Sequence, residues 1–265
     1  GGLFRVIQFT QDDAHIFCTE KQLEDEISKV IDLVDLIYSK FKFEYTIELS
    51  TRPEKRIGSD EIWDKAEKAL KNVLDKKKIK YKTNKGDGAF YGPKIDFHLK
   101  DSLERTWQCG TIQVDFSMPE RFELEYTDKN NEKKIPIMVH RAIYGSLERF
   151  IGILLEHYNG RLPIWLAPIQ VRILNFTDRN EKYAKKIIEK LYKEIPNARI
   201  DCDFEAKTVQ AKVKEAELMK IPLIIVVGDK EEKENSVAVR KNGKVQNVKF
   251  DKFIENLRSE IKNRE

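Results

Sequence analysis

Residues 135–157 place a short strand directly before a helix, and this order constrains where two functional side chains can lie. The apolar run Ile135–Val139 is typical of a buried strand. Apolar residues then recur at helical spacing to about His157, at Ile143, Leu147, Ile151 and Leu154. Within one helix, His140 and Arg149 would face opposite ways, because each residue turns the helix by roughly 100°. They can share a site more easily if His140 ends the strand and Arg149 lies inside the helix.

Two glycines accompany this arginine in the sequence. Gly145, Arg149 and Gly152 are spaced so that one helical face would carry all three. Glycine lowers helix stability, so the pair predicts a close approach to another surface. Arg149 would then lie in a partly dry place, where a guanidinium needs anionic partners. The alternative is a helix with two tolerated glycines and a solvent-facing arginine.

Length and composition indicate a globular protein of one large domain or two ordinary ones, since the chain has 265 residues and is 40% hydrophobic. No apolar run is long enough to span a membrane, and the N-terminus lacks the features of a signal peptide. Three widely spaced cysteines do not form a disulfide framework, which indicates a reducing cytoplasm. Residues 1–168 carry a net charge of −1 and residues 169–265 carry +5. That bias permits nucleic-acid binding, although lysine-rich solvated helices cause it more often.

The N-terminal segment places a carboxylate and an imidazole on one side of a predicted strand. Leu3–Phe9 has a strand pattern without a visible partner, and the chain looks like a piece whose upstream sequence is missing. In a second strand, Ala14–Cys18, His15 would lie on the opposite face from Cys18 and on the same side as Asp13. Such a pair suits metal ligation or acid–base chemistry. The alternative is a turn followed by a histidine with ordinary partners.

Further elements of the first part of the chain alternate between packing helices and polar strands. A capping-box pattern at Thr19 begins a helix to about Phe41, a strand follows at Phe43–Ser50, and Ser59 caps a helix to about Lys78. A glycine-rich loop at 85–94 lacks the spacing of a P-loop but can bring backbone close to a ligand. Strands are predicted at Ile95–Leu99 and Arg105–Phe116; the second is interrupted by Gln108, Thr111 and Gln113. Buried amides need partners, and a polar ligand could supply them.

A proline-bounded linker, Leu162–Pro168, divides the chain into predicted domains at 1–168 and 169–265. Strands and helices alternate in the second domain, which predicts an α/β fold. The predicted strands are Val171–Phe176, Ala198–Phe204, Pro222–Gly228 and Ser236–Lys241, and the predicted helices are Asn180–Glu194, Thr208–Met219 and Asp251–Lys262.

Five motifs in this order together resemble the threonyl-tRNA synthetase family of class II aminoacyl-tRNA synthetases. They are Phe9–Cys18, Leu49–Lys55, Gly88–Lys94, Gln108–Thr111 and His140–Phe150. The resemblance implies an α/β and α+β architecture: a catalytic domain with an antiparallel sheet and flanking helices at 1–168, then a smaller α/β anticodon-binding domain at 169–265. It implies a C-terminal part of an enzyme that activates threonine with ATP and joins it to threonine tRNA.

The family resemblance also assigns a zinc ion to the site. His15 and His140 match two of its three protein ligands, and the third, a cysteine, lies upstream of this chain in the family. Cys18 is not a candidate, because it lies on the wrong side of its strand. An open zinc site can ligate the threonine hydroxyl, which valine lacks.

Substrate-binding positions follow from the same resemblance. Arg5 and Arg149 match arginines that hold the phosphates of ATP, which binds with magnesium. The positions that match residues around threonine and on the floor of the pocket are Gln11, Asp13, Tyr91, Lys94, Gln108, Thr111, Gln113 and Ser146. Adenylate formation needs positioning and charge neutralisation more than a general base.

Departures from the family pattern concern both domains. The family more often has arginine where Ile7 stands, and its second-motif arginine and dimer-forming motif are upstream. In the second domain, Glu231 and Arg240 match anticodon-reading positions, whereas Ala206 and Lys214 replace the usual Asn and Arg. The resemblance implies a cytoplasmic homodimer without membrane contact. A non-catalytic RNA-binding paralogue is the alternative, and a stand-alone metal hydrolase is a weaker third hypothesis because no water-activating base stands beside the histidines.

Overall fold

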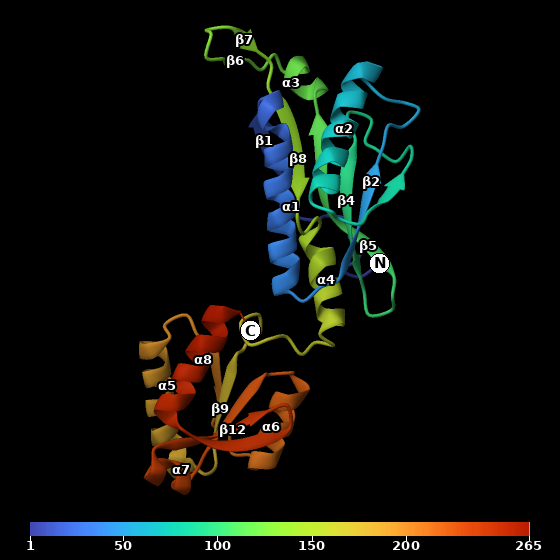
Figure 1. Ribbon diagram of the computed structural model, residues 1–265. Coiled ribbons are helices and arrows are strands. Elements are labelled where there is room, and N and C mark those ends of the chain that lie inside the picture. Colours follow the sequence, from blue (N-terminus) through green and yellow to red (C-terminus); the bar gives the residue numbers. More distant parts are fainter. Residues whose placement is uncertain (265) are drawn as a thin grey trace. The chain divides into compact units, whose positions relative to one another are not determined.

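The computed structural model describes residues 1–264 and divides the chain into two compact units, Gly1–His157 and Tyr158 onward. Each unit is built on its own sheet (Figure 1). The first sheet has the strand order β1-β8-β5-β4-β2-β3 and is antiparallel except for the β2–β3 pair. Its strands are β1 (Ala14–Cys18), β2 (Tyr45–Ser50), β3 (Lys82–Asn84), β4 (Lys94–Lys100), β5 (Thr106–Asp115) and β8 (Ile137–Ala142).

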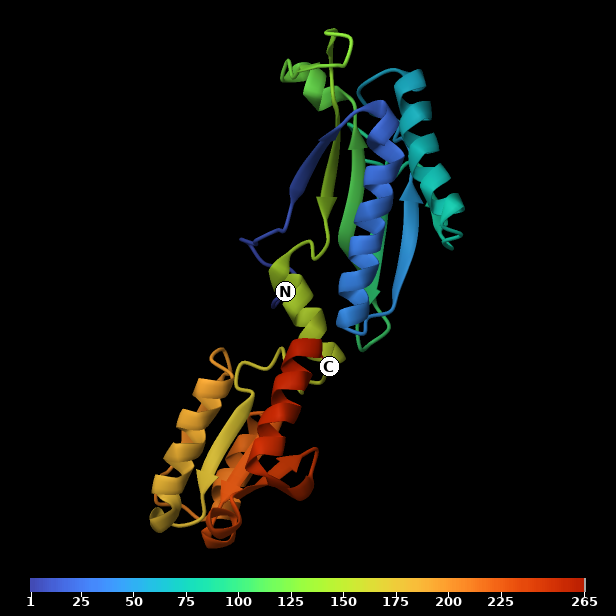
Figure 2. The ribbon, with the colours of Figure 1, turned by 60° about the vertical axis from the view of Figure 1, so that its left-hand side comes forward.

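Two long helices, α1 (Leu23–Lys40) and α2 (Asp60–Lys76), lie together along one face of this sheet (Figure 2). Their starts follow from local sequence: Thr19 and Gln22 form the predicted capping box in the short helix η1 (Glu20–Gln22), and the Ser59 hydroxyl accepts a hydrogen bond from the amide of Ile62. Alternate strand residues such as Ile95 and Phe97 are fully buried on the side of the helices. The opposite, polar face is therefore left to carry a site.

The remaining elements of the first unit are short, apart from helix α4 (Leu147–His157). Helix α3 (Ser117–Arg121) and the strands β6 (Tyr126–Thr127) and β7 (Lys133–Lys134) lie between β5 and β8. The predicted strand at Leu3–Phe9 was wrong: these residues form turns and bends. Alternating apolar residues make a strand only where a neighbouring strand supplies hydrogen bonds, and among the described residues none pairs with this segment.

The second unit has a five-stranded sheet in the order β10-β9-β11-β12-β13. The strands β9 (Val171–Asn175), β10 (Ile200–Asp203) and β11 (Leu223–Val227) are parallel, and β12 (Ser236–Lys241) and β13 (Lys244–Lys249) continue the sheet antiparallel. Helices α5 (Glu181–Glu194) and α8 (Phe250–Asn263) pack on one face and α6 (Val209–Leu218) on the other. Two short helices, η2 (Asp178–Asn180) and α7 (Asp229–Glu234), complete the unit.

Two differences from the sequence-based expectations concern this unit. The segment predicted as a linker packs into it, because Ile164 is buried in its core and Arg199 donates to the carbonyl oxygens of Trp165 and Ala167. The division between the compact units therefore falls before this segment in the sequence, after His157, whereas the predicted boundary followed residue 168. Strand β13 was not predicted, since it is exposed and carries few apolar residues. Within residues 1–264, none of the helices combines the length and apolar character needed to cross a bilayer.

Candidate active site

A row of polar side chains crosses the open face of the first sheet. His15 on β1 is paired in register with His140 on β8, which is paired with Gln113 on β5, which is paired with Lys94 on β4. The two imidazole rings are 4.7 Å apart between centroids and meet edge to face. Residues 125 positions apart in sequence are thus neighbours, because antiparallel pairing sets them side by side with the same orientation.

Carboxylate and phenol groups hold the centre of this row. The Nε2 atom of His140 lies 3.0 Å from Oδ2 of Asp115, a fully buried carboxylate. The Tyr91 hydroxyl donates to Oε1 of Gln113, and its ring lies 5.2 Å from that of His140. Burial, followed by the nearby charges of Asp115 and Asp13, raises the pKa of Tyr91. The phenol therefore stays protonated at neutral pH and acts as a hydrogen-bond donor.

Asp96 on β4 is a buried hub that the sequence interpretation missed. Its carboxylate accepts hydrogen bonds from Ser50 Oγ (2.8 Å), Gln108 Nε2 (2.5 Å) and Thr111 Oγ1 (3.3 Å), and pairs with Lys94 Nζ at 3.0 Å. Asp96 thus holds the amide nitrogen of Gln108, an exposed residue that lines the cavity described below. A signal was present in the sequence, since a carboxylate inside the apolar run from Ile95 to Phe97 must find partners when buried.

Arg149, inside α4, is held by backbone oxygens and an aromatic ring. Its Nε donates to the Phe4 carbonyl oxygen at 3.0 Å, its Nη1 donates to that of Gln108 at 3.2 Å, and its guanidinium lies 5.4 Å from the Trp107 ring centroid. Among residues 1–264, no carboxylate forms an ion pair with it. The geometry thus fixes the side chain while leaving its charge available to an anionic ligand.

The two glycines near Arg149 do not lie on one helical face with it, contrary to the prediction. Gly145 precedes α4 and adopts a left-handed backbone (φ +65°), so it does not share a helical face with Arg149. A Cβ there would collide with the carbonyl oxygen of Cys109, and one at Gly152 would meet Phe4 within 3.3 Å. Both glycines therefore allow the predicted close approach, one in a turn and one in the helix.

Asp12 organises the turn that joins β8 to α4, and the sequence interpretation did not identify it. Its carboxylate accepts hydrogen bonds from the amides of Ile143, Tyr144 and Gly145 and from Nη1 of Arg141. This arrangement ties the N-terminal segment to the start of α4. It therefore keeps Gln11 and Arg149 beside the same cavity.

That cavity, of about 470 Å³, lies on the open face of the sheet, and its lining includes Gln113, the register partner of His140. It brings together most of the predicted substrate-binding residues: Arg5, Gln11, Gln108, Thr111, Gln113, Ser146 and Arg149. Tyr91 and Lys94 are not in its lining: Tyr91 donates to Gln113, and Lys94 pairs with Asp96, which holds Gln108 and Thr111. Asp13 is exposed close to Tyr91. Burial raises the pKa of the Cys109 thiol, which also lines the cavity, to about 12. That cysteine is therefore no nucleophile at neutral pH.

The described residues supply only part of a metal site. In residues 1–264, no group of three His, Cys, Asp or Glu side chains has the arrangement of a metal site. Cys18 is buried while His15 is exposed, as strand alternation predicts, and burial together with the charge of Glu26 raises the thiol pKa to about 11. The chain thus supplies two adjacent imidazoles and no thiolate beside them.

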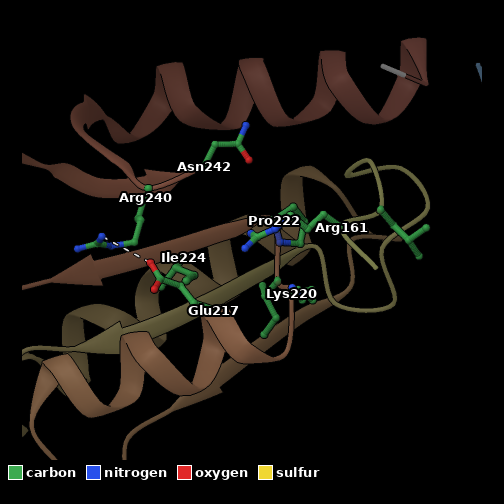
Figure 3. A pocket seen from close by; sticks show the side chains of 10 residues that line it. Arg161, Glu217, Lys220, Pro222, Ile224, Arg240 and Asn242 are labelled. Carbon is green, nitrogen blue, oxygen red and sulfur yellow. Dashed lines mark ion pairs between the residues drawn. The ribbon is translucent and has the colours of Figure 1, made fainter. Parts of the chain in front are cut away.

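The second unit contains both predicted base-reading residues. Glu231 caps the start of α7, because its Oε2 accepts a hydrogen bond from the Gly228 amide at 3.0 Å. Its Oε1 lies 3.5 Å from Nδ2 of Asn247. Arg240 on β12 lies 3.5 Å from Glu217 (Figure 3). Arg240 and Asn247 lie on the same face of the β12–β13 hairpin, the face not covered by α5 and α8. Their side chains therefore face one surface.

Comparison with protein-family models assigns each unit. Residues 1–158 match the tRNA synthetase class II core domain (G, H, P, S and T), and residues 170–260 match the anticodon binding domain. The chain belongs to the class II tRNA synthetase family. Within this class II chain, the matched core contains the histidine row and the arginine-lined cavity, and the second match contains Glu231 and Arg240.

Two curated relatives of this class II synthetase chain carry the name threonine–tRNA ligase. The chain is 54% identical over 98% of its length to the threonine–tRNA ligase of Caldanaerobacter subterraneus and 53% identical over 99% to that of Clostridium tetani. The chain spans only about two-fifths of those relatives, 40% and 41%.

Solved structures agree with this assignment. The RNA binding domain of threonyl-tRNA synthetase from Cryptosporidium parvum superposes with a TM-score of 0.92 at 40% identity, covering 98% of this chain and 66% of that one. A putative threonyl-tRNA synthetase from Aeropyrum pernix gives 0.80 at 28% identity, covering 100% and 66%. The predicted fold class is therefore confirmed.

Proposed function

We propose that this chain is the part of a threonine–tRNA ligase that carries most of the aminoacylation site and the anticodon-binding domain. The protein would activate threonine with ATP and transfer it to threonine tRNA. One observation carries the proposal: the paired imidazoles of His15 and His140 adjoin a cavity whose arginine, Arg149, has no carboxylate partner in residues 1–264. A purely RNA-binding paralogue would have no use for this pairing.

Within the cavity, the side chains divide by chemistry. Arg5 and Arg149 are suited to the phosphates of ATP with its magnesium, because guanidinium groups neutralise charge that builds up on phosphorus. Gln11, Asp13, Tyr91, Lys94, Gln113 and Ser146 are suited to threonine, and Gln108 and Thr111 support them through Asp96. These residues orient the carboxylate of threonine towards the α-phosphate of ATP, and this positioning accounts for most of the rate acceleration.

A zinc ion fits the two imidazoles. His15 and His140 would hold it, and Asp115 would orient His140, as carboxylates commonly do for metal-binding histidines. When bound, zinc would supply an open position for the amino and hydroxyl groups of threonine. Its third protein ligand would come from outside this chain, because the buried Cys18 cannot serve. A cytoplasmic homodimer belongs to the same proposal.

The test is threonine-dependent exchange of pyrophosphate into ATP by the full-length protein that contains this chain. Arg149→Lys removes the planar fork and one or two charge-assisted hydrogen bonds, which predicts a loss of about 10- to 100-fold. Arg105→Lys is the matched control, since Arg105 lies over the same Trp107 ring but pairs with Asp101. An Arg149→Lys rate equal to that of the control would remove Arg149 from the mechanism. Binding of tRNA without any exchange by the unaltered protein would favour the paralogue.

A further inference from the structure

The N-terminal segment, residues 1–13, carries Arg5 and Gln11 to the cavity of the first unit from outside the named strands. It consists of turns and bends together with an isolated antiparallel bridge between Gln11 and Ser146. A strand inside a sheet is fixed by a row of backbone hydrogen bonds to its neighbours, and this segment has no such row among the described residues. Its position therefore depends on side chains.

Asp12 holds this segment against the turn between β8 and α4. Its Oδ1 accepts hydrogen bonds from the amides of Tyr144 at 3.0 Å and Gly145 at 3.1 Å. Its Oδ2 accepts from the amide of Ile143 at 2.9 Å and from Nη1 of Arg141 at 3.1 Å. The same Nη1 donates to the backbone oxygen of Asp12 at 2.8 Å. Because the carboxylate is only 18% exposed, these charge-assisted hydrogen bonds are partly shielded from water.

The turn is also anchored from its other side. The hydroxyl of Tyr38, a fully buried residue of α1, donates to the backbone oxygen of Ile143 at 2.5 Å. The turn directly follows β8, which is hydrogen-bonded to a strand on each side. The sheet and α1 thus set the place of the turn, and Asp12 sets the place of the N-terminal segment relative to it.

Asp12 lies between two groups of residues that line the cavity, but it is not in the lining itself. Gln11, the residue before it, lines the cavity from the N-terminal segment. Ser146 and Arg149 line it from the turn and from α4. Asp12 is therefore placed to set the distance between these two groups without contacting a ligand.

We propose that Asp12 is a positioning residue for the formation of threonyl-adenylate, in which a carboxylate oxygen of threonine bonds to the α-phosphorus of ATP as the bond to pyrophosphate breaks. The inference rests on the proposed function and adds to it a residue that acts through others. Gln11 on one side is suited to threonine and Arg149 on the other to the phosphates, so Asp12 aligns the two reactants. A misplacement of about 1 Å can slow a reaction by about 100-fold, whereas each substrate keeps its own contacts. Loss of Asp12 therefore lowers the rate of the chemical step more than the affinity for either substrate.

Rapid-quench measurement of threonyl-adenylate formation tests this role, with the full-length protein that contains this chain and without tRNA. The amplitude of the first turnover counts the correctly folded sites, and its rate constant reports the chemical step. In Asp12→Asn an amide nitrogen replaces one of the two acceptor oxygens, so the rate constant should fall by about 10- to 100-fold at full amplitude. The dissociation constants of threonine and of α,β-methylene-ATP should each change by less than about 3-fold, because ground-state contacts are kept.

A second variant separates position from charge. Asp12→Glu keeps the carboxylate but is longer by one methylene group, so it displaces the segment and should also lower the rate constant by about 10-fold or more. An Asp12→Glu rate constant equal to that of the unaltered protein would assign the effect to charge and overturn the inference.

The matched control is Asp128→Asn. The carboxylate of Asp128 also accepts hydrogen bonds from two backbone amides, those of Asn130 and Glu132. It pairs with Lys134 in the β6–β7 hairpin, outside the cavity. This variant loses the same kinds of bond away from the reactants, so its rate constant and amplitude should match those of the unaltered protein.

The outcomes separate this inference from the proposed function. An unaltered protein that forms no threonyl-adenylate would refute the proposed function, and this inference with it. With an active unaltered protein, a normal rate constant in Asp12→Asn would overturn the inference alone, and a reduced amplitude would then show that the residue only stabilises the fold. A loss of affinity for one substrate that accounts for the whole effect would also overturn it. Should Asp12→Asn give no folded protein by its melting curve, the rate constant and amplitude of Asp12→Glu decide by the same criteria.

Discussion

Removing the charge of Asp96 is expected to destabilise the catalytic unit strongly. Its carboxylate is 2% exposed and accepts from three side chains while pairing with Lys94 at 3.0 Å, and the Lys94 side chain is 13% exposed. Removing one partner of a buried ion pair lowers the free energy of unfolding by about 3–5 kcal/mol. Because Asn keeps one acceptor and the shape, we expect Asp96→Asn to lower the free energy of unfolding by about 3 kcal/mol.

The structure provides a control on the same lysine. Asp87 lies 3.7 Å from Lys94 but its side chain is 61% exposed, so solvent screens the interaction. Asp87→Asn should therefore change the free energy of unfolding by no more than about 0.5 kcal/mol. In a double-mutant cycle, Lys94→Met should recover part of the loss in Asp96→Asn, with a coupling of about 1–2 kcal/mol.

Urea titration followed by hydrogen exchange of peptides from residues 1–157 would report the first unit separately from the second. A loss below about 1 kcal/mol in Asp96→Asn, or a loss equal to that of Asp87→Asn, would refute the reasoning from buried charge. Melting of the second unit should be unchanged in both variants, because the hub lies wholly within the first.

Three further predictions concern other parts of the chain. Gly92→Ala should cost about 3 kcal/mol or more in urea titration, because the new Cβ would collide with a backbone carbonyl oxygen of β5; a milder loss would mean that the loop moves aside. Burial raises the pKa of Asp101, but hydrogen bonds from Trp107 and the surrounding loop outweigh it and hold the pKa at about 2. The free energy of unfolding should therefore fall by about 1–2 kcal/mol between pH 4 and pH 2, a figure reduced for solvent screening. Asp101→Asn should remove this part of the pH dependence. Glu231→Ala and Arg240→Ala should narrow the difference in affinity between threonine tRNA and other tRNAs in filter binding; unchanged discrimination would leave both without a base-reading role.

Local sequence patterns determined most elements and the side on which strand residues lie. Strand alternation predicted His15 and Cys18 on opposite faces, and the capping residues Thr19 and Ser59 begin helices where predicted. These features depend on residues within a few positions of each other, so the sequence alone carries them. The same holds for the strand–helix order that separates His140 from Arg149.

Tertiary structure decided what depends on distant partners. Leu3–Phe9 alternates like a strand but has no strand beside it among the described residues, and Ile164 belongs to the second unit because its side chain fills that core. The register between β1 and β8 decides that His15 meets His140, and the sheet encloses Asp96 with three polar neighbours from two other strands. Hydrogen bonds and burial of this kind join residues far apart in sequence, so no local pattern contains them.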